Sequence, residues 1–562
     1  MKVFHSLNPL LFIIILTVII YGNSLNNDFW AIDDPVVINN PHIQHFTLQN
    51  LKDIFNPSFI IEEGTYYKPF VYLSFSLEYF VWKNNPFGYH LTNLIIFIIS
   101  LVFIYLTLEL LFKNTFIPFV TTLLFAVHPV HSEAVLWISS RTHLLSALFC
   151  LTSFYFFIRS AEITGNLRIF YYFLSLLNFV FALFSHPFSC VYAMLLLLYF
   201  YCFPVKLEKK YKIAFIIILF FIGAGCEFIS FFFQHAQKWR LQTMEETGIL
   251  KNLFISVIVL GKYCKLLFWP AGLSAIYKIN TDVKFLRIDF IMSLLLWVLL
   301  VCSILYNAVK DKELFFASGW FIIFYIPVSH IFMPLIFNMA DRYLYFPSVG
   351  IFLLFSILLY RFLKGKSKII KNSLLTAAII IICFLSFLTY ERTLLWPDSM
   401  TLCNDILSKY DVDIVYNHRG YMYNNNGEYD KAINDFTHAL SLNPELVEAY
   451  YNRGSAYFNK NDYDRAIRDF THAINLKPDY VVSLNGRGMA YMKRGEYNRA
   501  IADFTTALKF EPSSYQLYSN RAFAYYMNKE YDKALEDAKK ITEAGYNIDP
   551  TFLNILQKKA KQ

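Results

Sequence analysis

Residues 91–112 read LTNLIIFIISLVFIYLTLELLF, an apolar run that holds one charged side chain, Glu109. A helix needs roughly 20 apolar residues to cross about 30 Å of bilayer hydrocarbon. Runs of similar length and composition recur along residues 1–390. The stretch therefore predicts one span of a helical domain that crosses the membrane many times.

The composition of the whole chain agrees with this prediction. Of 562 residues, 56% are hydrophobic and 16% are charged, whereas soluble domains have roughly 45–50% apolar and about 25% charged residues. This composition excludes a soluble enzyme, a disordered scaffold and a collagen-like fibre. The net charge of +8 comes from the apolar part of the chain, where membrane topology explains basic residues better than nucleic-acid binding does.

The sequence predicts eleven spans, the first of them an uncleaved anchor. They lie near residues 9–25, 91–112, 116–134, 143–159, 169–185, 189–204, 213–233, 290–309, 314–332, 345–361 and 371–389. The apolar stretch 251–270 carries Lys262 and Lys265 in its middle. We expect this stretch to be interfacial or re-entrant rather than a twelfth span.

Basic residues in the short loops predict the orientation, because Lys and Arg collect on the cytoplasmic side. One set of loops holds Lys2, Lys113, Arg159, Arg168, Lys206, Lys209, Lys210, Lys212, Lys310, Lys312, Arg361, Lys364, Lys366, Lys368 and Lys371. The amino terminus is then cytoplasmic. A long first loop, 26–90, and the polar region 391–562 face the other compartment, either the periplasm of a bacterial inner membrane or a eukaryotic lumen.

The polar region contains a repeat of 34 residues. Four sets of positions are in register: Tyr423, Tyr457, Tyr491 and Tyr525; Ala432, Ala466, Ala500 and Ala534; Gly420, Gly454 and Gly488, with Ala522 fourth; Phe436, Phe470 and Phe504, with Ala538 fourth. This pattern is typical of tetratricopeptide repeats, in which paired helices stack into a solenoid. It predicts a linker over 391–412 and four repeats over 413–446, 447–480, 481–514 and 515–548, with 549–562 as a polar end. The array is expected to bind a peptide or protein; a folded spacer or a dimerisation surface is the alternative.

A first chemical cluster follows the first span, at Asp33-Asp34-Pro35. Two adjacent carboxylates at a membrane surface are costly to hold together, since like charges raise one pKa. One acid could take a proton from an incoming hydroxyl while the other holds a hydroxyl, an amide or a cation. The structural alternative is a helix start, with Asp as the cap and Pro in the first turn.

A second cluster ends the third predicted span, at His128-Pro129-Val130-His131-Ser132-Glu133, followed by Trp137, Arg141 and His143. Ionisable groups this close to hydrocarbon are costly unless they line a wet cavity. His128 and His131 suit hydrogen bonding to a phosphate, and Arg141 suits a bidentate clamp. Their spacing with Glu133 is not a recognised metal motif. The alternative is that these side chains reach into lipid head groups.

A third cluster lies where the tenth predicted span begins, at Asp341-Arg342-Tyr343-Leu344-Tyr345. Asp341 could simply neutralise Arg342, and the two tyrosines could belong to an aromatic belt at the membrane surface. The charge-based topology nevertheless places all three clusters on the non-cytoplasmic face. His186, after the fifth span, falls on the same face and could join them.

Together these motifs resemble the transmembrane and tetratricopeptide-repeat-containing O-mannosyltransferases and their bacterial relatives. The resemblance rests on an ordered set that covers nearly the whole chain: Asp33-Asp34-Pro35, Tyr67-Lys68-Pro69, Gly88-Tyr89-His90, His128 to Arg141, Arg342 to Gly350, and Arg392, Trp396 and Asp398. Lys68 stands where the family usually has Arg, and Ser185-His186-Pro187 where it tends to have Ser-Lys-Glu.

The resemblance implies a type-C glycosyltransferase fold. The donor would be a sugar, a hexose such as mannose, carried on a polyprenyl phosphate, and the acceptor a protein Ser or Thr hydroxyl. Asp33 would be the general base and Asp34 would orient acceptor or sugar, although the two roles could be exchanged. The resemblance suggests that the donor phosphate or sugar would be bound by Lys68, His128, His131, Glu133, Arg141, Arg342, Tyr343 and Tyr345.

The sequence is also compatible with two other hypotheses for the function. The chain could transfer sugar to a lipid or glycan, or it could be a non-catalytic membrane-anchored scaffold for protein assembly. No metal site is predicted, and a divalent metal is left open as a cofactor. The sugar and the acceptor are not specified by the sequence.

Overall fold

The computed structural model describes residues 2–30, 34, 39–56, 67–205, 207–235, 248–279, 287–331, 338–546 and 548–560. Within these ranges the regular structure is helical and contains no strand, which confirms the predicted all-α fold class. The chain divides into two compact units, Met1–Asp405 and Ile406–Gln562. Each unit is described by itself.

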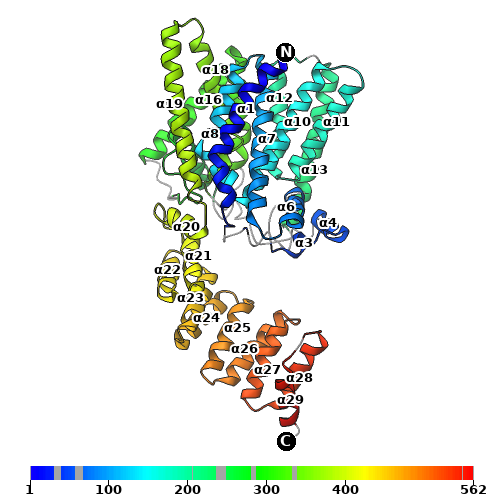
Figure 1. The fold of residues 1–562 in the computed structure, drawn as a ribbon, viewed down its shortest axis with the longest axis vertical. Helices are drawn as coiled ribbons and strands as arrows, with labels where there is room; N and C mark the ends of the chain where they lie inside the picture. The colour runs from blue at the N-terminus through cyan, green and yellow to red at the C-terminus, as the bar shows by residue number, and fades with distance from the viewer. Residues whose placement is uncertain are drawn as a thin grey trace. The chain divides into compact units, whose positions relative to one another are not determined.

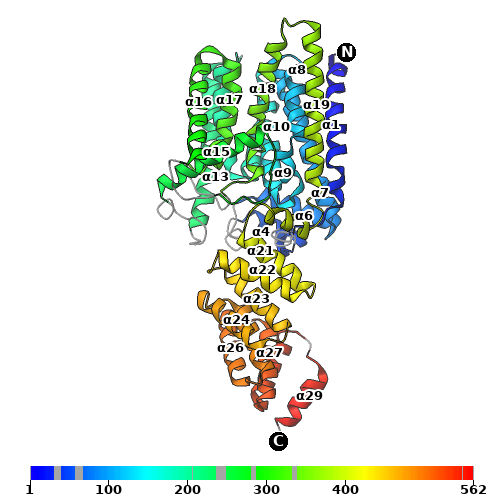
Figure 2. The ribbon, with the colours of Figure 1, turned by 90° about the vertical axis from the view of Figure 1, so that its left-hand side faces the viewer.

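The first unit is a bundle of long helices (Figures 1 and 2). Its long helices are α1 (Lys2–Tyr21), α7 (Pro86–Phe112), α10 (Arg141–Glu162), α11 (Asn166–Leu183), α13 (Lys209–His235), α15 (Ile249–Phe268), α16 (Ile288–Lys310) and α19 (Lys368–Thr393). Shorter helices complete the bundle: α6 (Pro69–Trp82), α8 (Phe116–Val127), α12 (Tyr192–Cys202), α17 (Lys312–Tyr325) and α18 (Ser348–Leu363).

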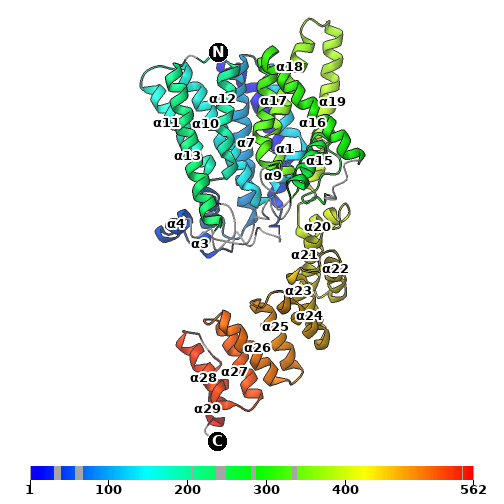
Figure 3. The same cartoon turned by 180° about the vertical axis from the view of Figure 1, so that it is seen from behind.

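Short helices gather at the bundle end opposite the amino terminus (Figure 3). Figure 3 labels α3 (Pro41–Gln44) and α4 (Leu48–Phe55) there. Other short helices of the first unit are η2 (Pro129–His131), α9 (Ser132–Leu136), η3 (Ile138–Ser140), η4 (Pro187–Val191), η5 (Ile326–Val328) and η6 (Asp341–Leu344). The remaining short elements are η1 (Gly22–Asn26) and α20 (Ser399–Leu407). Contacts join the described residues of the three clusters, because Asp34 accepts hydrogen bonds from Ser139 and Glu133 pairs with Arg342. The connections from α7 to α8, α10 to α11, α16 to α17 and α18 to α19 lie at the other end, which carries the amino terminus (Figures 1 to 3).

Six helices in the described part are long and apolar enough to cross a membrane. They are Pro9–Asn26, Pro86–Phe112, Ile138–Glu162, Asn166–Leu183, Ile288–Lys310 and Lys368–Thr393. A seventh crossing is possible if the pair Phe116–Val127 and Pro129–Leu136, bent by 58°, counts as one. Each of the eleven predicted ranges contains a helix, but the number of spans stays a prediction.

The bend between α8 and α9 follows from the sequence at residues 128–129. Pro129 cannot donate a backbone hydrogen bond, and its ring disfavours a helical residue before it. His128 accordingly adopts an extended conformation with ψ 125°, and its Nδ1 accepts a hydrogen bond from the Val130 N–H at 3.3 Å. The bend brings the second chemical cluster into the bundle end.

Helices α17 and α18 approach each other at Gly350. A Cβ atom at this position would lie 2.5 Å from the carbonyl oxygen of Ala317 and 2.6 Å from the backbone nitrogen of Phe321. Small residues allow such close approach of helix backbones in membrane proteins. The contact positions α18 and the cluster immediately before it.

We predict that Gly350→Ala destabilises the first unit by roughly 1–3 kcal/mol, because backbone atoms must move to admit the methyl group. Gly22→Ala is the matched control, since an added Cβ there meets nothing within 4 Å. Thermal unfolding of the detergent-solubilised protein, followed by size-exclusion chromatography, measures both. Equal stability of the two variants would contradict the close helix contact.

The second unit consists of four helix pairs and a last helix. The pairs are α21 (Asp413–Asn425) with α22 (Tyr429–Leu442), α23 (Val447–Asn459) with α24 (Tyr463–Leu476), α25 (Val481–Lys493) with α26 (Tyr497–Phe510), and α27 (Tyr515–Met527) with α28 (Tyr531–Glu543). Helix α29 (Pro550–Lys559) follows. Each predicted repeat is thus one pair of antiparallel helices.

The loss of Gly and Phe in the fourth repeat has a packing explanation. In the third repeat a Cβ on Gly488 would lie 2.6 Å from the ring of Phe504. The fourth repeat has Ala522 and Ala538 at these positions, and both are buried. Without the phenyl ring, the methyl group of Ala522 fits.

Candidate active site

Asp34, the second acid of the predicted catalytic pair, is almost fully buried. Its Oδ2 accepts a hydrogen bond from the backbone N–H of Trp30 at 2.9 Å. Its Oδ1 accepts from the backbone N–H of Ser139 at 3.0 Å and from the Ser139 hydroxyl at 2.6 Å. Burial raises the pKa of Asp34 to about 6, and the three hydrogen bonds oppose that rise. Asp34 therefore fastens the first loop to η3, while Asp33 lies outside the described residues.

Glu133 and Arg342 form a buried ion pair between the second and third clusters. The Arg342 Nη1 pairs with one carboxylate oxygen of Glu133, and the Arg342 backbone N–H donates to the other at 3.0 Å. The guanidinium carbon also lies 4.5 Å from the ring centre of Trp137 and 5.1 Å from that of Tyr343. Two motifs separated by 209 residues thus share one site.

Arg141 is fully buried and held by protein groups. Its Nη1 pairs with Glu78, its Nε donates to Oδ1 of Asn93 at 2.8 Å, and its Nη2 donates to the Tyr89 carbonyl at 2.9 Å. The guanidinium carbon lies 4.4 Å from the ring centre of Phe75. These contacts join α6, α7 and α10 at the same bundle end as the other clusters.

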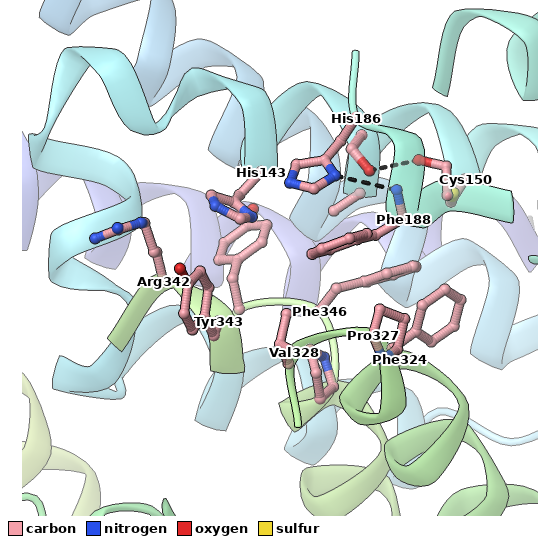
Figure 4. A pocket seen from close by; sticks show the side chains of 15 residues that line it. His143, Cys150, His186, Phe188, Phe324, Pro327, Val328, Arg342, Tyr343 and Phe346 are labelled. Atoms are coloured by element: carbon pink, nitrogen blue, oxygen red, sulfur yellow. Dashed lines mark hydrogen bonds between the residues drawn. The ribbon is translucent and has the colours of Figure 1, made fainter. Parts of the chain in front are cut away.

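A cavity of about 50 Å³ lies between α10, η4, η5 and η6 (Figure 4). Its polar lining includes His143, His186, Arg342, Tyr343, Tyr345, Ser146 and Ser189. Its apolar lining includes Ala147, Phe188, Phe324, Pro327, Val328 and Phe346. A cation and two imidazoles thus share one cavity with a largely aromatic wall, which suits a ligand with one anionic and one apolar part.

The two histidines face each other in Figure 4, with ring centres 5.0 Å apart. The Nδ1 of His186 accepts a hydrogen bond from the Phe188 N–H at 3.1 Å. Burial, followed by the charges of Lys68 and Arg342, lowers the pKa of His186 to about 3. The ring is therefore neutral at neutral pH, and Lys68 lies near enough to add positive charge to this part of the site.

His128 and His131 occupy the packed interior beside α18. The Nε2 of His128 lies 3.1 Å from the Leu267 carbonyl oxygen. The ring centre of His131 lies 4.1 Å from that of Phe125 and 5.4 Å from that of Tyr345. Of these residues only Tyr345 also lines the cavity. The structure thus brings Arg342, Tyr343 and Tyr345 to the cavity and places His128, His131, Glu133 and Arg141 behind it.

A second, smaller cavity lies beside Asp34. Its lining residues are Asp28, Phe29, Trp30, Asp34, Leu136, Trp396, Asp398 and Leu402. The ring centre of Trp30 lies 4.6 Å from that of Trp137 and 6.0 Å from that of Trp396. The Asp28 N–H donates to the Pro397 carbonyl at 3.0 Å. The segment after α19 therefore packs on the start of the first loop.

Sequence reasoning missed Glu78, Asn93 and Ser139, which hold Arg141 and Asp34. Glu78 lies in the region predicted as a long loop, where the structure has the apolar helix α6. A single acid in the apolar run 69–82 was the available signal, because such an acid needs a buried partner. Ser139 and Asn93 carry no comparable signal. In the described part of the chain, no group of three or more His, Cys, Asp or Glu side chains is placed to hold a metal ion.

Comparisons with known proteins agree with both parts of the predicted organisation. A family model described as "TPR repeat" matches residues 420–461 and 488–529, and one described as "Tetratricopeptide repeat" matches 447–480. The prediction of tetratricopeptide repeats is therefore confirmed, while the bounds of the four repeats and of the linker stay predictions. The crystal structure of MamA is similar at 24% identity and a TM-score of 0.25, covering 29% of this chain and 90% of that one.

Several curated proteins are similar over most of this chain. "Protein O-mannosyl-transferase F38B6.6" of Caenorhabditis elegans is 25% identical over 460 residues, covering 78% of this chain and 63% of the relative. Human "Protein O-mannosyl-transferase TMTC1" is 23% identical and covers 76% and 54%; human TMTC3 is 25% identical and covers 76% and 51%. The chain thus spans between half and two thirds of the length of these relatives. They confirm the resemblance to this family.

Proposed function

We propose that this chain, a relative of the membrane protein O-mannosyltransferases, transfers a hexose such as mannose from a polyprenyl phosphate to a Ser or Thr hydroxyl of a protein. The observation that carries the proposal is the cavity lined by Arg342, two histidines and an apolar wall. The names of the relatives supply the reaction class.

The cavity offers a cation for the phosphate of a lipid phosphate and an apolar wall for its lipid chain. Arg342 supplies a guanidinium, which matches phosphate oxygens in a bidentate manner. His143, His186 and Tyr343 add polar groups around it, and Lys68 adds charge nearby. Phe188, Phe324 and Phe346 offer an apolar surface for the first isoprene units. Because this wall excludes water, the cation stabilises the leaving phosphate more strongly than it would in solution.

The acid pair supplies the base in this proposal. Asp33 takes the proton of the acceptor hydroxyl while the hydroxyl oxygen attacks the anomeric carbon. The bond between that carbon and the phosphate oxygen breaks, and polyprenyl phosphate leaves with the electron pair. Attack opposite the leaving group inverts the anomeric configuration. Asp34, with both carboxylate oxygens hydrogen-bonded, fixes the backbone next to the base and borders the smaller cavity, which we assign to the acceptor side.

The buried residues behind the cavity position it. Glu133 orients Arg342 through two contacts, and Arg141 joins α6, α7 and α10. His128 and His131 pack between these elements and α18. We place the site on the non-cytoplasmic face, because the opposite bundle end carries the basic loops. The repeats would then hold the acceptor in the same compartment.

We expect Arg342→Lys to weaken binding of a polyprenyl-phosphate sugar roughly 10- to 100-fold, as for loss of a hydrogen bond to a charged group. Lys68→Gln removes a charge near His186 from a residue that does not line the cavity, so it should weaken binding less. Lysine keeps the charge of Arg342 but not its bidentate geometry. Lys83→Gln is the control, since Lys83 lies over the rings of Tyr79 and Phe80, whereas Lys68 is the lysine whose charge acts on His186. Binding of radiolabelled polyprenyl-phosphate mannose to the purified chain measures the effect. Unchanged affinity in both site variants would overturn this assignment of the donor site.

A further inference from the structure

Two histidines from different parts of the chain meet in the cavity at Arg342 (Figure 4). His143 lies in the first turn of α10, and His186 is the N-cap of η4. Their ring centres lie 5.0 Å apart, and the ring centre of Tyr343 lies 5.8 Å from that of His143. Both imidazoles line the cavity, so a ligand that enters it can contact both.

The two imidazole rings differ in their hydrogen bonds. The Nδ1 of His186 accepts a hydrogen bond from the Phe188 N–H at 3.1 Å, which fixes the proton of the neutral ring on Nε2. That second nitrogen lies on the side of the ring that faces His143 in Figure 4. Among the described residues, no hydrogen bond holds either ring nitrogen of His143. His143 can therefore take up a proton without breaking a bond to the protein, whereas His186 would lose its bond to Phe188.

The charged and titratable groups around His143 favour an anion in the cavity. They are His186 before η4, Arg342 and Tyr343 of η6, and Lys68 before α6. Cys150 and Tyr345 complete the titratable lining, and no Asp or Glu is among the described lining residues. Positive charges oppose protonation of a nearby imidazole, and an anion reverses this effect. The protonation of His143 is therefore expected to depend on the charge of the ligand.

The proposed reaction changes the charge of the lipid phosphate. The donor is a phosphodiester, which carries one negative charge. When the bond between the anomeric carbon and the phosphate oxygen breaks, that oxygen keeps the electron pair and the phosphate becomes a monoester. A phosphate monoester has a second pKa of about 6 and therefore carries close to two negative charges at pH 7. Product formation thus places a second negative charge beside the two imidazoles.

We propose that His143 takes up one proton from solvent when a phosphate monoester occupies the cavity, and that the resulting imidazolium binds the lipid phosphate released by the transfer reaction. This inference rests on the proposed function, because it assigns a residue to the product of that reaction. A charged imidazolium forms a stronger hydrogen bond to phosphate than a neutral ring does. His186 stays neutral and donates its Nε2–H. Arg342 is charged throughout the physiological pH range, so it binds donor and product without a change of protonation.

The proton uptake fixes the sign of the pH dependence. At pH 8 the free monoester is a dianion and His143 is neutral, so the complex holds one proton more than its separate partners. Binding of the monoester therefore tightens as the pH falls. Below about pH 6 the free monoester already carries the proton, and the dependence levels off. A phosphodiester keeps one charge across this range, so its binding does not change with pH.

Titration calorimetry with the full-length chain in detergent tests the inference. The probes are polyprenyl phosphate, a monoester, and its methyl ester, a diester of the same lipid. The affinity for the monoester is expected to rise roughly 10- to 100-fold from pH 8 to pH 6, because one proton gives at most about tenfold per pH unit. The affinity for the methyl ester should stay within about twofold, since no proton is linked to its binding. Equal pH profiles of the two lipids would overturn the proposal.

The same calorimetry measures the proton directly, without any substitution. Binding heats in two buffers that differ in ionisation enthalpy give the number of protons taken up. At pH 7.5 we expect an uptake approaching one proton for the monoester and none for the methyl ester. Monoester binding without proton uptake would contradict the proposal.

Two matched substitutions identify the residue that holds the proton. His143→Asn removes the titrating ring, so the monoester affinity should change less than about threefold from pH 8 to pH 6. In His186→Asn the amide oxygen can still accept the Phe188 N–H. This variant should bind both lipids roughly 2- to 10-fold more weakly, as for one lost hydrogen bond, and keep the pH dependence of the monoester. A pH dependence that survives His143→Asn would contradict the assignment.

A transfer assay separates this inference from the proposed function. Monoester binding with the expected proton uptake, but without any sugar transfer from polyprenyl-phosphate mannose, would contradict the proposed function alone. Sugar transfer by a chain whose monoester binding is independent of pH would contradict the role of His143 alone.

Discussion

Replacing Asp33 with Asn is expected to lower the rate of mannose transfer roughly 10²- to 10⁴-fold, the usual contribution of a general base. The amide keeps the size of the carboxylate but does not accept the proton of the acceptor hydroxyl. Binding of the polyprenyl-phosphate donor should stay unchanged, because its phosphate is assigned to the cavity at Arg342. Initial rates with saturating donor and a Ser/Thr peptide measure the effect.

Asp34→Asn is the informative comparison for this experiment. The oxygen of an asparagine amide can accept the two hydrogen bonds from Ser139. Its NH₂ group would then face the Trp30 N–H, which now donates a hydrogen bond to Oδ2 of Asp34, and two donors would meet. Leaving a buried donor without a partner costs about 1–3 kcal/mol. We therefore expect Asp34→Asn to lower both stability and rate, and Asp33→Asn to lower the rate alone. If the Asp34→Asn variant is stable but inactive and the Asp33→Asn variant is active, then Asp34 is the general base and Asp33 the positioning residue.

Arg141→Met is expected to destabilise the first unit by about 3–5 kcal/mol, the cost of leaving the buried Glu78 carboxylate without its partner. The guanidinium also binds Asn93 and the Tyr89 carbonyl, so adding Glu78→Leu should recover part of the loss and not all of it. Arg159→Met on the same helix is the control. Its partner Glu162 is exposed and 3.4 Å away, and such pairs contribute about 0–1 kcal/mol.

The same variants separate two roles for Arg141. Thermal unfolding in detergent reports stability, and radiolabelled polyprenyl-phosphate binding reports the donor site. A positioning residue predicts a loss of stability that the Glu78→Leu substitution partly reverses. Normal stability of Arg141→Met with lost lipid binding would show instead that Arg141 contacts the phosphate directly, as the sequence alone suggested.

The sequence predicted the repeats in detail because their packing is local. A helix pair of one repeat brings Gly488 against Phe504, 16 residues away, so the constraint recurs at every period. The helical class of the first unit was also predictable from local sequence. Its long apolar runs indicate membrane spans, and a span in lipid is helical because a helix satisfies its backbone hydrogen bonds internally. The predicted all-α fold is confirmed for the described residues of both units.

The partners of the ionisable residues could not be predicted from spacing. Glu133 meets Arg342 across 209 residues and Asp34 meets Ser139 across 105, and single-sequence patterns contain no signal for such long-range pairs. Arg141 illustrates the consequence. Its position between apolar runs suggests either a ligand clamp or an interfacial side chain, and its actual contacts include Glu78, an acid in a helix that the sequence did not predict.

The cavity itself follows from breaks in the helices. Pro129 ends α8, and η2 to η3 replace a continuous helix up to Arg141. Pro187 begins η4, and η6 at Asp341–Leu344 precedes α18. Irregular backbone at membrane depth is tolerated where it is buried in protein or lines a cavity. Proline and histidine residues at the ends of apolar runs were thus the sequence signals that indicated a candidate functional site.

A direct transfer assay tests the central claim that this cavity and the first loop form one glycosyl-transfer site. The purified full-length chain is mixed with polyprenyl-phosphate mannose and a Ser/Thr-rich peptide, and the peptide is analysed by mass spectrometry. We predict a mass gain of one hexose on a Ser or Thr with release of polyprenyl phosphate. Donor bound by the chain while the peptide and the lipid stay unmodified would contradict that claim.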